Sequence, residues 1–209
     1  MKSKVAKIIL IVLLIIIVLI VINLIRNYSI IKEISNSNEK FEENIGKMKN
    51  FYLLKETKSS SKDGYMNVKT EVYYKDAIYL EKVEGNVNDE KNTTITWYDY
   101  NNKNGIRISN NTEEEITSND IPKITSLIDI YDKLSNQDIA KALFSKYLFM
   151  PIPVKENCYV FNDNGTSTYI NIENKLIKKS IGKGIEKTQE FNEGIVQDTD
   201  VEKPNIENL

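Results

Sequence analysis

Residues 8–25 form a run of 18 residues in which Asn23 is the only polar side chain. An α-helix rises about 1.5 Å per residue, so this run spans roughly 27 Å, close to the hydrocarbon thickness of a bilayer. A helix that packs in the core of a soluble domain needs a polar stripe on its solvent side, and this run has none. The sequence therefore predicts a membrane-spanning helix near the N-terminus.

The residues that flank this run distinguish an uncleaved anchor from a cleaved signal peptide. A signal peptide has an apolar region of about 7–15 residues followed by small residues, whereas here a longer run leads into Arg26, Asn27 and Tyr28. No cysteine lies near residue 20, which excludes lipid modification at this end. Lysines precede the run and only Arg26 follows it closely, which favours a cytoplasmic N-terminus. We therefore expect a single-pass cell-membrane protein whose main domain is extracytoplasmic.

The chain beyond the membrane run is net acidic. The first 26 residues hold four basic residues and no acidic one, whereas the whole chain has 28 Lys and Arg against 30 Asp and Glu. A mixed, acidic surface excludes nucleic acid as an expected partner. With one cysteine the chain forms no internal disulfide, so its domain depends on a hydrophobic core. The abundance of Asn, Lys and Ile is typical of an AT-rich bacterial genome.

Helical spacing continues beyond the membrane run. Apolar residues recur on one helical stripe at Ile30, Ile34, Phe41, Ile45 and Met48. The polar stretch 35–38 is a poor helix interior, so we predict a break there and an amphipathic helix from about Asn38 to Lys49, with a stalk helix alone as the alternative. The predicted segments are a cytoplasmic tail (1–7), a transmembrane anchor (8–26), a juxtamembrane stalk (27–37), a domain (38–201) and a polar tail (202–209).

From Phe51 onward the apolar period changes to two, which is the spacing of strands. Residues 66–74, for example, alternate between an apolar and a largely polar face. Turn signals rich in Asn, Asp, Gly and Ser separate the strands by short connections, which predicts antiparallel pairing. The predicted strands are 51–58, 65–74, 77–84, 93–100, 105–109, 156–162, 166–172, 176–181 and 185–196.

Helical spacing returns between the fifth and the sixth predicted strand. It predicts a helix over residues 121–134, with Asp120 as its N-cap, and a second helix over residues 137–148 that ends before Pro151. Strands interrupted by a helical pair, without strand–helix–strand alternation, predict an α+β fold. We therefore expect a single N-terminal transmembrane helix followed by a curved antiparallel sheet, an incomplete β-barrel, covered by helices.

Three stretches carry a resemblance to a known family. They are the helix that leads into "NFYLLKETK", the aromatic hairpin "ITWYDYNNKNGIRI" and the closing meander "CYVFNDNGTSTYINIENKLIKKS". This arrangement resembles the LolA-like superfamily of lipoprotein carriers, over most of residues 38–201. The resemblance implies a curved sheet with a concave apolar surface that accepts an acyl chain. The carriers are soluble shuttles, so a chain that keeps its anchor departs from them.

The residue types present exclude most enzymatic chemistry. No histidine occurs in the chain, which rules out Ser/His/Asp and Cys/His nucleophilic sites and removes the usual nitrogen ligand of zinc. Cys158 is expected to be a small buried hydrophobe on a strand beside Val160. Residues 113–115 (Glu-Glu-Glu) are expected to be a solvated acidic turn or helix start, because the ligand spacing of a calcium loop is absent. We predict no enzyme, no cofactor and no metal site.

The densest aromatic cluster is Trp97, Tyr98 and Tyr100. By alternation, Trp97 points into the core or onto the floor of a lipid cavity, while the two tyrosines cover the outer side of the sheet. We predict a binding module for an apolar or lipidic ligand, such as a lipoprotein acyl chain. The alternative is a cell-envelope scaffold in which helices fill the concave face and a protein partner meets the outer tyrosines. The predicted ligand-lining residues are Val68, Val72, Leu80, Ile95, Trp97, Ile106, Leu127, Ile128, Tyr131 and Phe144.

Overall fold

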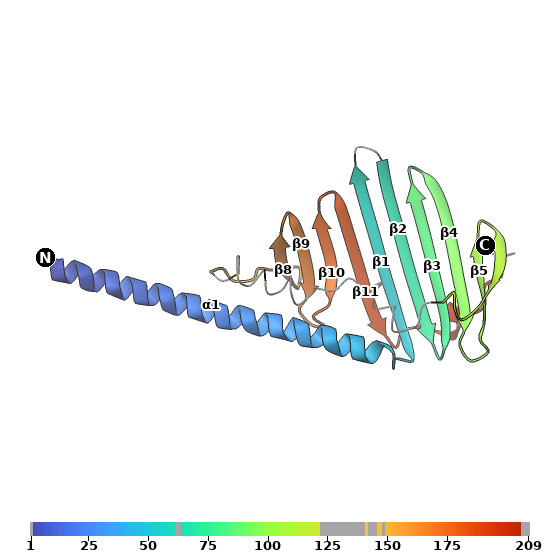
Figure 1. The fold of residues 1–209 in the computed structure, drawn as a ribbon, viewed down its shortest axis with the longest axis horizontal. Coiled ribbons are helices and arrows are strands. Elements are labelled where there is room, and N and C mark those ends of the chain that lie inside the picture. Colours follow the sequence, from blue (N-terminus) through green and yellow to red (C-terminus); the bar gives the residue numbers. More distant parts are fainter. Residues whose placement is uncertain (1, 62–63, 122–140, 142–145, 148, 206–209) are drawn as a thin grey trace.

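One long helix and one large sheet make up the fold (Figure 1). The computed structural model describes residues 2–61, 64–121, 141, 146–147 and 149–205. Helix α1 (Lys2–Ile45) runs for 44 residues without interruption, so the predicted break at 35–38 is absent. Polar residues such as Ser and Asn cost only a few tenths of a kcal/mol each in a helix, and burial of Ile34 and Ile45 on either side outweighs that cost.

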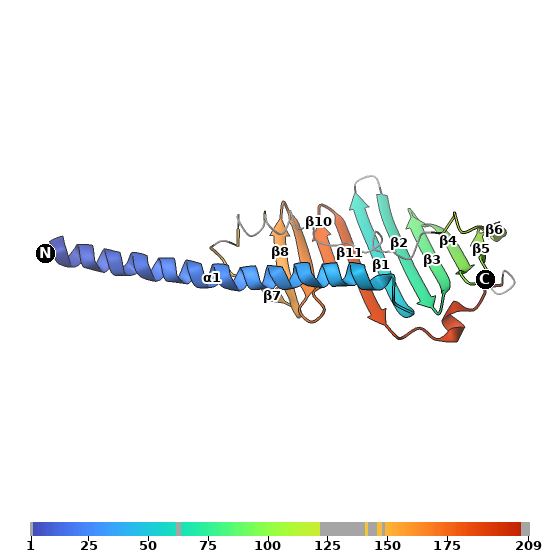
Figure 2. The ribbon, with the colours of Figure 1, turned by 60° about the horizontal axis from the view of Figure 1, so that its bottom comes forward.

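The two halves of α1 have different surroundings. The first half carries the apolar run, whose side chains are exposed except for the half-buried Ile20, Asn23 and Leu24. Among the described residues, α1 is the one helix long and apolar enough to cross a membrane. The second half lies along the sheet (Figure 2) and buries Ile30, Ile31 and Ile34 against it. Residues 27–37 therefore pack on the domain instead of forming a separate stalk.

The described strands form a single open antiparallel sheet of eleven strands in an α+β fold. Two meanders, β1 to β6 and β7 to β11, are joined by the pairing of β1 with β11. The nine predicted strands are confirmed to within a few residues, and β6 and β7 are two more at the edges. The strands are β1 (Asn50–Ser61), β2 (Gly64–Lys75), β3 (Ile78–Val87), β4 (Glu90–Asp99), β5 (Asn104–Ser109), β6 (Thr112–Ile116), β7 (Val154–Lys155), β8 (Cys158–Asp163), β9 (Thr166–Asn171), β10 (Ile177–Gly182) and β11 (Ile185–Glu193).

Two-residue turns set the register of most hairpins. Asn88–Asp89, Asn110–Asn111 and Asn164–Gly165 have positive φ at both positions, as the tight turns that match strand twist require. Asn, Asp and Gly tolerate this conformation better than other residues, which is why the turn signals in the sequence located the strand ends.

The main core lies between α1 and one face of the sheet, here called the helix side. Leu53, Val72 and Tyr79 point to this side and are completely buried. Two clusters fill it: one contains Ile45 and the sheet residues of β1 to β6, and the other contains Ile34 and residues of β8 to β10. The opposite face, here called the far side, carries Leu54, Glu71, Leu80 and Trp97 among others.

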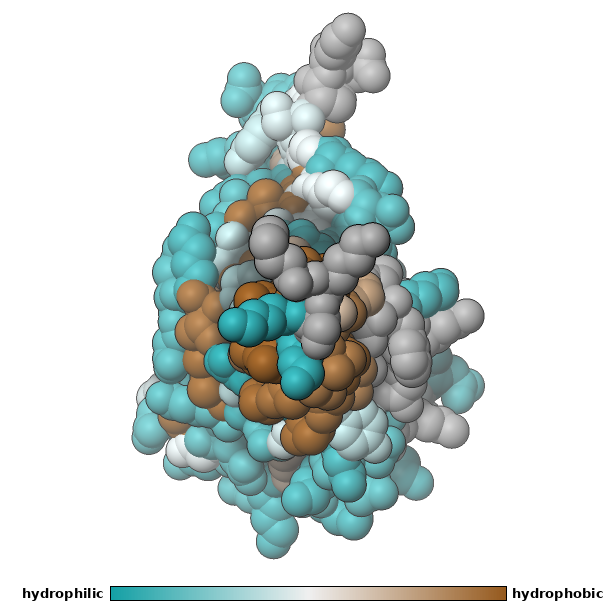
Figure 3. Space-filling model, turned by 90° about the vertical axis from the view of Figure 1, so that its left-hand side faces the viewer, coloured by the Kyte–Doolittle hydropathy of each residue, from teal (hydrophilic) through white to brown (hydrophobic). Residues whose placement is uncertain are grey.

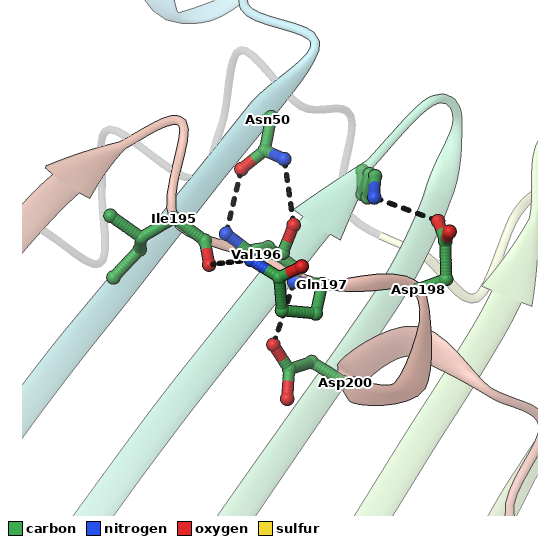
Figure 4. Close-up of polar contacts among 7 residues, drawn as sticks. Asn50, Ile195, Val196, Gln197, Asp198 and Asp200 are labelled. Carbon is green, nitrogen blue, oxygen red and sulfur yellow. Dashed lines mark hydrogen bonds and ion pairs between the residues drawn. The ribbon is translucent and has the colours of Figure 1, made fainter.

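A C-terminal strap, residues 195–203, crosses from the end of β11 to the far side (Figure 4). Asn50 fixes its start, because its amide nitrogen donates to the Val196 carbonyl (2.8 Å) and its amide oxygen accepts from the Val196 N–H (2.9 Å). Lys75 then forms an ion pair with Asp198 at 2.7 Å. The strap continues through a short 3₁₀ helix, η2 (Asp198–Val201), that lies on β2 and β3.

The predicted helical pair lies almost entirely outside the described residues. Of its two segments, the structure describes only Ile121, Lys141, Lys146 and Tyr147. Ile121 and Tyr147 are both buried, in the two clusters on the helix side.

Candidate binding surface

A seam opens where β10 leaves β11. The two strands pair only over residues 179–182 and 185–188, although β11 continues to Glu193. The register of β10 shifts at Ile177, and the strands diverge toward the end of β11 (Figure 1). Gln189 is buried in this gap, and its side-chain amide donates to the Ile177 carbonyl at 2.9 Å.

The divergence leaves a backbone edge of β11 in the seam. The Gly194 N–H donates to the Asn50 carbonyl, so hydrogen bonds to β1 recur at every second residue, at Asn192 and Glu190. The N–H and C=O groups of Phe191 and Glu193 then point the other way, toward the space that β10 has left. No described strand pairs with β11 there. An interior strand thus presents an edge that an added strand can pair with.

A cavity of about 530 Å³ occupies the seam. It is large enough for a ligand-sized segment, since ligand pockets measure about 300–1,000 Å³. Its lining mixes apolar with polar and charged side chains, so it suits an amphipathic ligand better than a purely apolar one. The lining residues are Leu54, Asn171, Glu173, Asn174, Leu176, Ile177, Lys178, Lys179, Thr188, Gln189, Glu190, Phe191 and Asn192.

Amide hydrogen exchange tests this edge. Lys187 and Phe191 point to the same side of β11, but only Lys187 has a β10 partner, Ser180. We expect the Phe191 amide to exchange at least about tenfold faster than the Lys187 amide, because only the latter is bonded between strands. The measurement is residue-resolved exchange on the full chain in detergent micelles. Equally slow exchange at the two positions would show that the seam is closed.

A half-buried carboxylate, that of Glu71, lies on the far side next to the seam. Glu71 accepts a hydrogen bond from the Tyr52 hydroxyl at 3.0 Å and forms an ion pair with Lys69 at 2.9 Å. Burial by itself raises the pKa of Glu71, but the bonds from Lys69 and Tyr52 outweigh burial, and the net pKa is lowered. Burial, followed by the bond to Glu71, raises the pKa of Tyr52. This wall therefore carries an ionised carboxylate beside a neutral hydroxyl.

The predicted ligand-lining residues do not form one surface. Val68 and Val72 point to the helix side, and Val72 is completely buried there. The other four predicted sheet residues point to the far side, because directly paired residues share a face. Their pairing and clustering place them together there: Leu80, Ile95, Trp97 and Ile106. The four predicted residues of the helical pair lie outside the described residues: Leu127, Ile128, Tyr131 and Phe144.

The far-side group is covered by the chain itself. The Trp97 indole N–H donates to the Val201 carbonyl of the strap at 2.9 Å, and the Lys203 ammonium lies 5.9 Å from the Trp97 ring centroid. Ile95 also lines a separate cavity of about 380 Å³. Trp97, which was predicted to line a lipid cavity, is thus covered by the C-terminal strap, and the strap accepts the hydrogen bond of the indole N–H.

The tyrosines of the aromatic cluster are not on the outer side of the sheet, which corrects that prediction. Tyr98 is 1% exposed in the main core, and Tyr100 packs against the same cluster with its ring edge-on to Tyr98. The prediction assigned Trp97 and the two tyrosines to the wrong faces of the sheet, because apolar residues occupy both faces. Tyr98 and Tyr100 therefore do not form an exposed surface that a protein partner could contact.

The remaining predicted groups are placed as follows. Cys158 is buried, as predicted, and burial raises the pKa of its thiol, which makes it a poor nucleophile. Residues 113–115 lie in strand β6, not in a turn or helix, and Glu114 pairs with Arg107 at 3.0 Å. Within the described residues, no three Asp, Glu or Cys side chains gather closely enough to hold a metal ion.

No protein-family model matches this sequence, and no curated protein is significantly similar to it. The candidate site therefore depends on its geometry alone.

Proposed function

We propose that this chain is a membrane-anchored, extracytoplasmic binding module without enzymatic activity, and that it receives an extended peptide segment of another cell-envelope protein in the β10–β11 seam. The observation that carries the proposal is the backbone edge of β11 at Phe191, which lines a cavity of about 530 Å³. A peptide that adds as a strand satisfies such an edge with its own N–H and C=O groups.

The lining supports a peptide over a lipid as the first candidate. Leu54 and Leu176 offer apolar contact, while Lys178, Glu173 and Asn192 offer charge and hydrogen bonds at the same site. A peptide presents backbone polar groups and side chains of both kinds, whereas an acyl chain leaves the polar groups of the site without partners.

A lipidic ligand is the second candidate. The apolar residues of the seam favour it, as does the proposal that the domain belongs to the LolA-like superfamily. That proposal is supported by the helix before the first strand and by the large antiparallel sheet. On the helix side, however, Leu53, Val72 and Tyr79 are completely buried, so the seam is the better candidate for either ligand.

Site-specific photocrosslinking separates the candidates. A photoreactive amino acid replaces Leu54, which is in the seam, or Val87, which is exposed at the end of β3 and outside it. In intact cells of the host, we expect a polypeptide adduct at position 54 that position 87 does not give. A synthetic peptide of the crosslinked segment should bind the purified full chain, and N-methylation of its backbone should abolish binding, since it removes the N–H donors.

The outcomes against the proposal are equally specific. A lipid adduct at position 54, confirmed by copurifying lipid in native mass spectra, would assign the seam to the second candidate. Equal labelling of positions 54 and 87 would leave the seam without a ligand and refute both candidates.

Membrane orientation is a prediction of its own. The three lysines before the apolar run support a cytoplasmic N-terminus and an outside domain. A protease added to intact protoplasts is expected to digest residues 27–209 and leave a cytoplasmic marker protein intact. Protection of the domain until the protoplasts are lysed would place it on the cytoplasmic side.

A further inference from the structure

The end of the apolar run is rigidly joined to the domain. Asn27 is completely buried, and its amide nitrogen donates to the carbonyls of Tyr147 (2.7 Å) and Met150 (2.9 Å). Its amide oxygen accepts from the Ile152 N–H at 3.2 Å. One turn earlier, the Asn23 amide nitrogen lies 3.5 Å from the Tyr147 carbonyl. These bonds hold Tyr147, Met150 and Ile152 against the helix.

The same bonds place this segment at the level where the apolar run ends. Asn23 and Asn27 stand two residues before and after Ile25, which is about 3 Å along the helix axis in each direction. The 18-residue run nearly matches the hydrocarbon thickness, so Ile25 marks the boundary between hydrocarbon and headgroups. The segment bonded to the two asparagines therefore lies in the interfacial region.

Large apolar side chains are exposed in this segment and directly after it. Phe149 is 64% exposed, Met150 is 56% exposed and Val154, in the edge strand β7, is 53% exposed. The view onto the end from which α1 projects shows apolar residues at its centre, where the apolar run of the helix points to the viewer, and polar residues around them (Figure 3). Arg26 and Lys146, both exposed, add positive charge beside them.

We infer that Phe149, Met150 and Val154 form an interfacial collar that inserts into the headgroup region of the bilayer around the membrane end of α1. Aromatic and apolar side chains are stabilised at this depth, and the adjacent Arg26 and Lys146 favour anionic headgroups. The collar is continuous with the apolar run, so lipid is the occupant that covers both. This inference rests on the proposed anchoring of α1.

The collar fixes which way the sheet faces. With β7 at the membrane, the strand order places β11 four strand spacings away, about 19 Å, and β4 eight spacings away, about 38 Å. The seam between β10 and β11 then opens close to the membrane surface, where a membrane-tethered partner can reach it.

Tryptophan quenching in vesicles tests the collar on the full chain. Trp97 is the only tryptophan of the native chain. It lies in β4, far from the collar, so its emission is an unquenched background. In phosphatidylcholine–phosphatidylglycerol vesicles whose acyl chains are brominated near the glycerol, the Phe149→Trp variant is expected to lose up to about half of its emission relative to unbrominated vesicles. Met150→Trp should behave alike and covers the case in which one variant misfolds.

Two controls separate the collar from the anchor. Val87→Trp, exposed and apolar but in β3, should show no quenching, and Leu13→Trp, in the apolar run, should be quenched. Quenching of Leu13→Trp without quenching of either collar variant would overturn the collar and leave the anchor standing. Absence of quenching at position 13 as well would overturn the anchoring on which the collar rests.

Discussion

Replacing Leu53 with alanine is expected to lower the free energy of unfolding by about 2–5 kcal/mol, a large part of the stability of a single domain. Leu53 lies in β1, is completely buried, and belongs to the cluster that joins the helix side of the sheet to α1. Truncation removes apolar contacts and leaves a cavity between two rigid elements that cannot close around it.

The neighbouring residue provides a matched control. Leu54 follows directly in the same strand but points to the far side, where it is only partly buried and lines the seam. Leu54→Ala is expected to cost about 1 kcal/mol at most. Urea unfolding of the full chain in detergent micelles, followed by near-ultraviolet circular dichroism, measures both. Equal losses for the two variants would contradict the assignment of the main core to the helix side.

The strands were predictable because two local signals agree. Period-two alternation marks each strand, and residues that tolerate positive φ, such as Asn88 and Asp89, mark where it turns. The edge strand β6 was missed because its Glu-rich sequence has no apolar alternation. It forms because it pairs with β5 and because Glu114 pairs with Arg107 there.

The prediction that the ligand-lining residues share one face of the sheet was wrong because of the register across a turn. Asp76 and Ala77 form a two-residue turn, which pairs Tyr74 with Tyr79 and therefore Val72 with Glu81. Leu80 consequently points to the face opposite to Val72, although both residues are apolar. The apolar character of a residue predicts which face of a sheet it points to only where one face is exposed to water. Here α1 covers one face, and the strap covers part of the other.

The sequence contains a feature that indicates the seam but did not enter the prediction. The last two predicted strands, 176–181 and 185–196, flank a tight turn but differ in length. Unequal arms of a hairpin leave the longer strand without a partner at its far end, unless another strand pairs there. The structure shows this outcome on the β10 side of residues 190–193 of β11.

The helix break illustrates how tertiary contacts override local propensity. Residues 35–38 are weak helix formers, yet the stripe on either side of them docks on one continuous sheet. A break would have prevented one straight helix from burying both Ile34 and Ile45 on the sheet. The burial of both residues outweighs the modest cost of the low helix propensity at residues 35–38.

Asn27→Ala is the second substitution for which we expect a large effect, a loss of about 2–4 kcal/mol in the free energy of unfolding. The change removes the hydrogen bonds of Asn27 to the carbonyls of Tyr147 and Met150 and to the N–H of Ile152, and a buried group that loses its partner costs about 1–3 kcal/mol until water reaches it. Membrane insertion should be unaffected, because the apolar run is unchanged.

Ser29→Ala is the control for Asn27→Ala, since it also removes a small polar side chain from α1 but at an exposed position. We expect it to be neutral or slightly stabilising, because alanine is the better helix former. The measurement is urea unfolding of the full chain in micelles, with limited proteolysis to detect release of residues 146–157 from the helix. If Asn27→Ala unfolds at the same urea concentration as Ser29→Ala and the segment stays protected, the junction between α1 and the domain is held by apolar packing alone. The asparagine would then not be what sets the collar at the level of the bilayer surface.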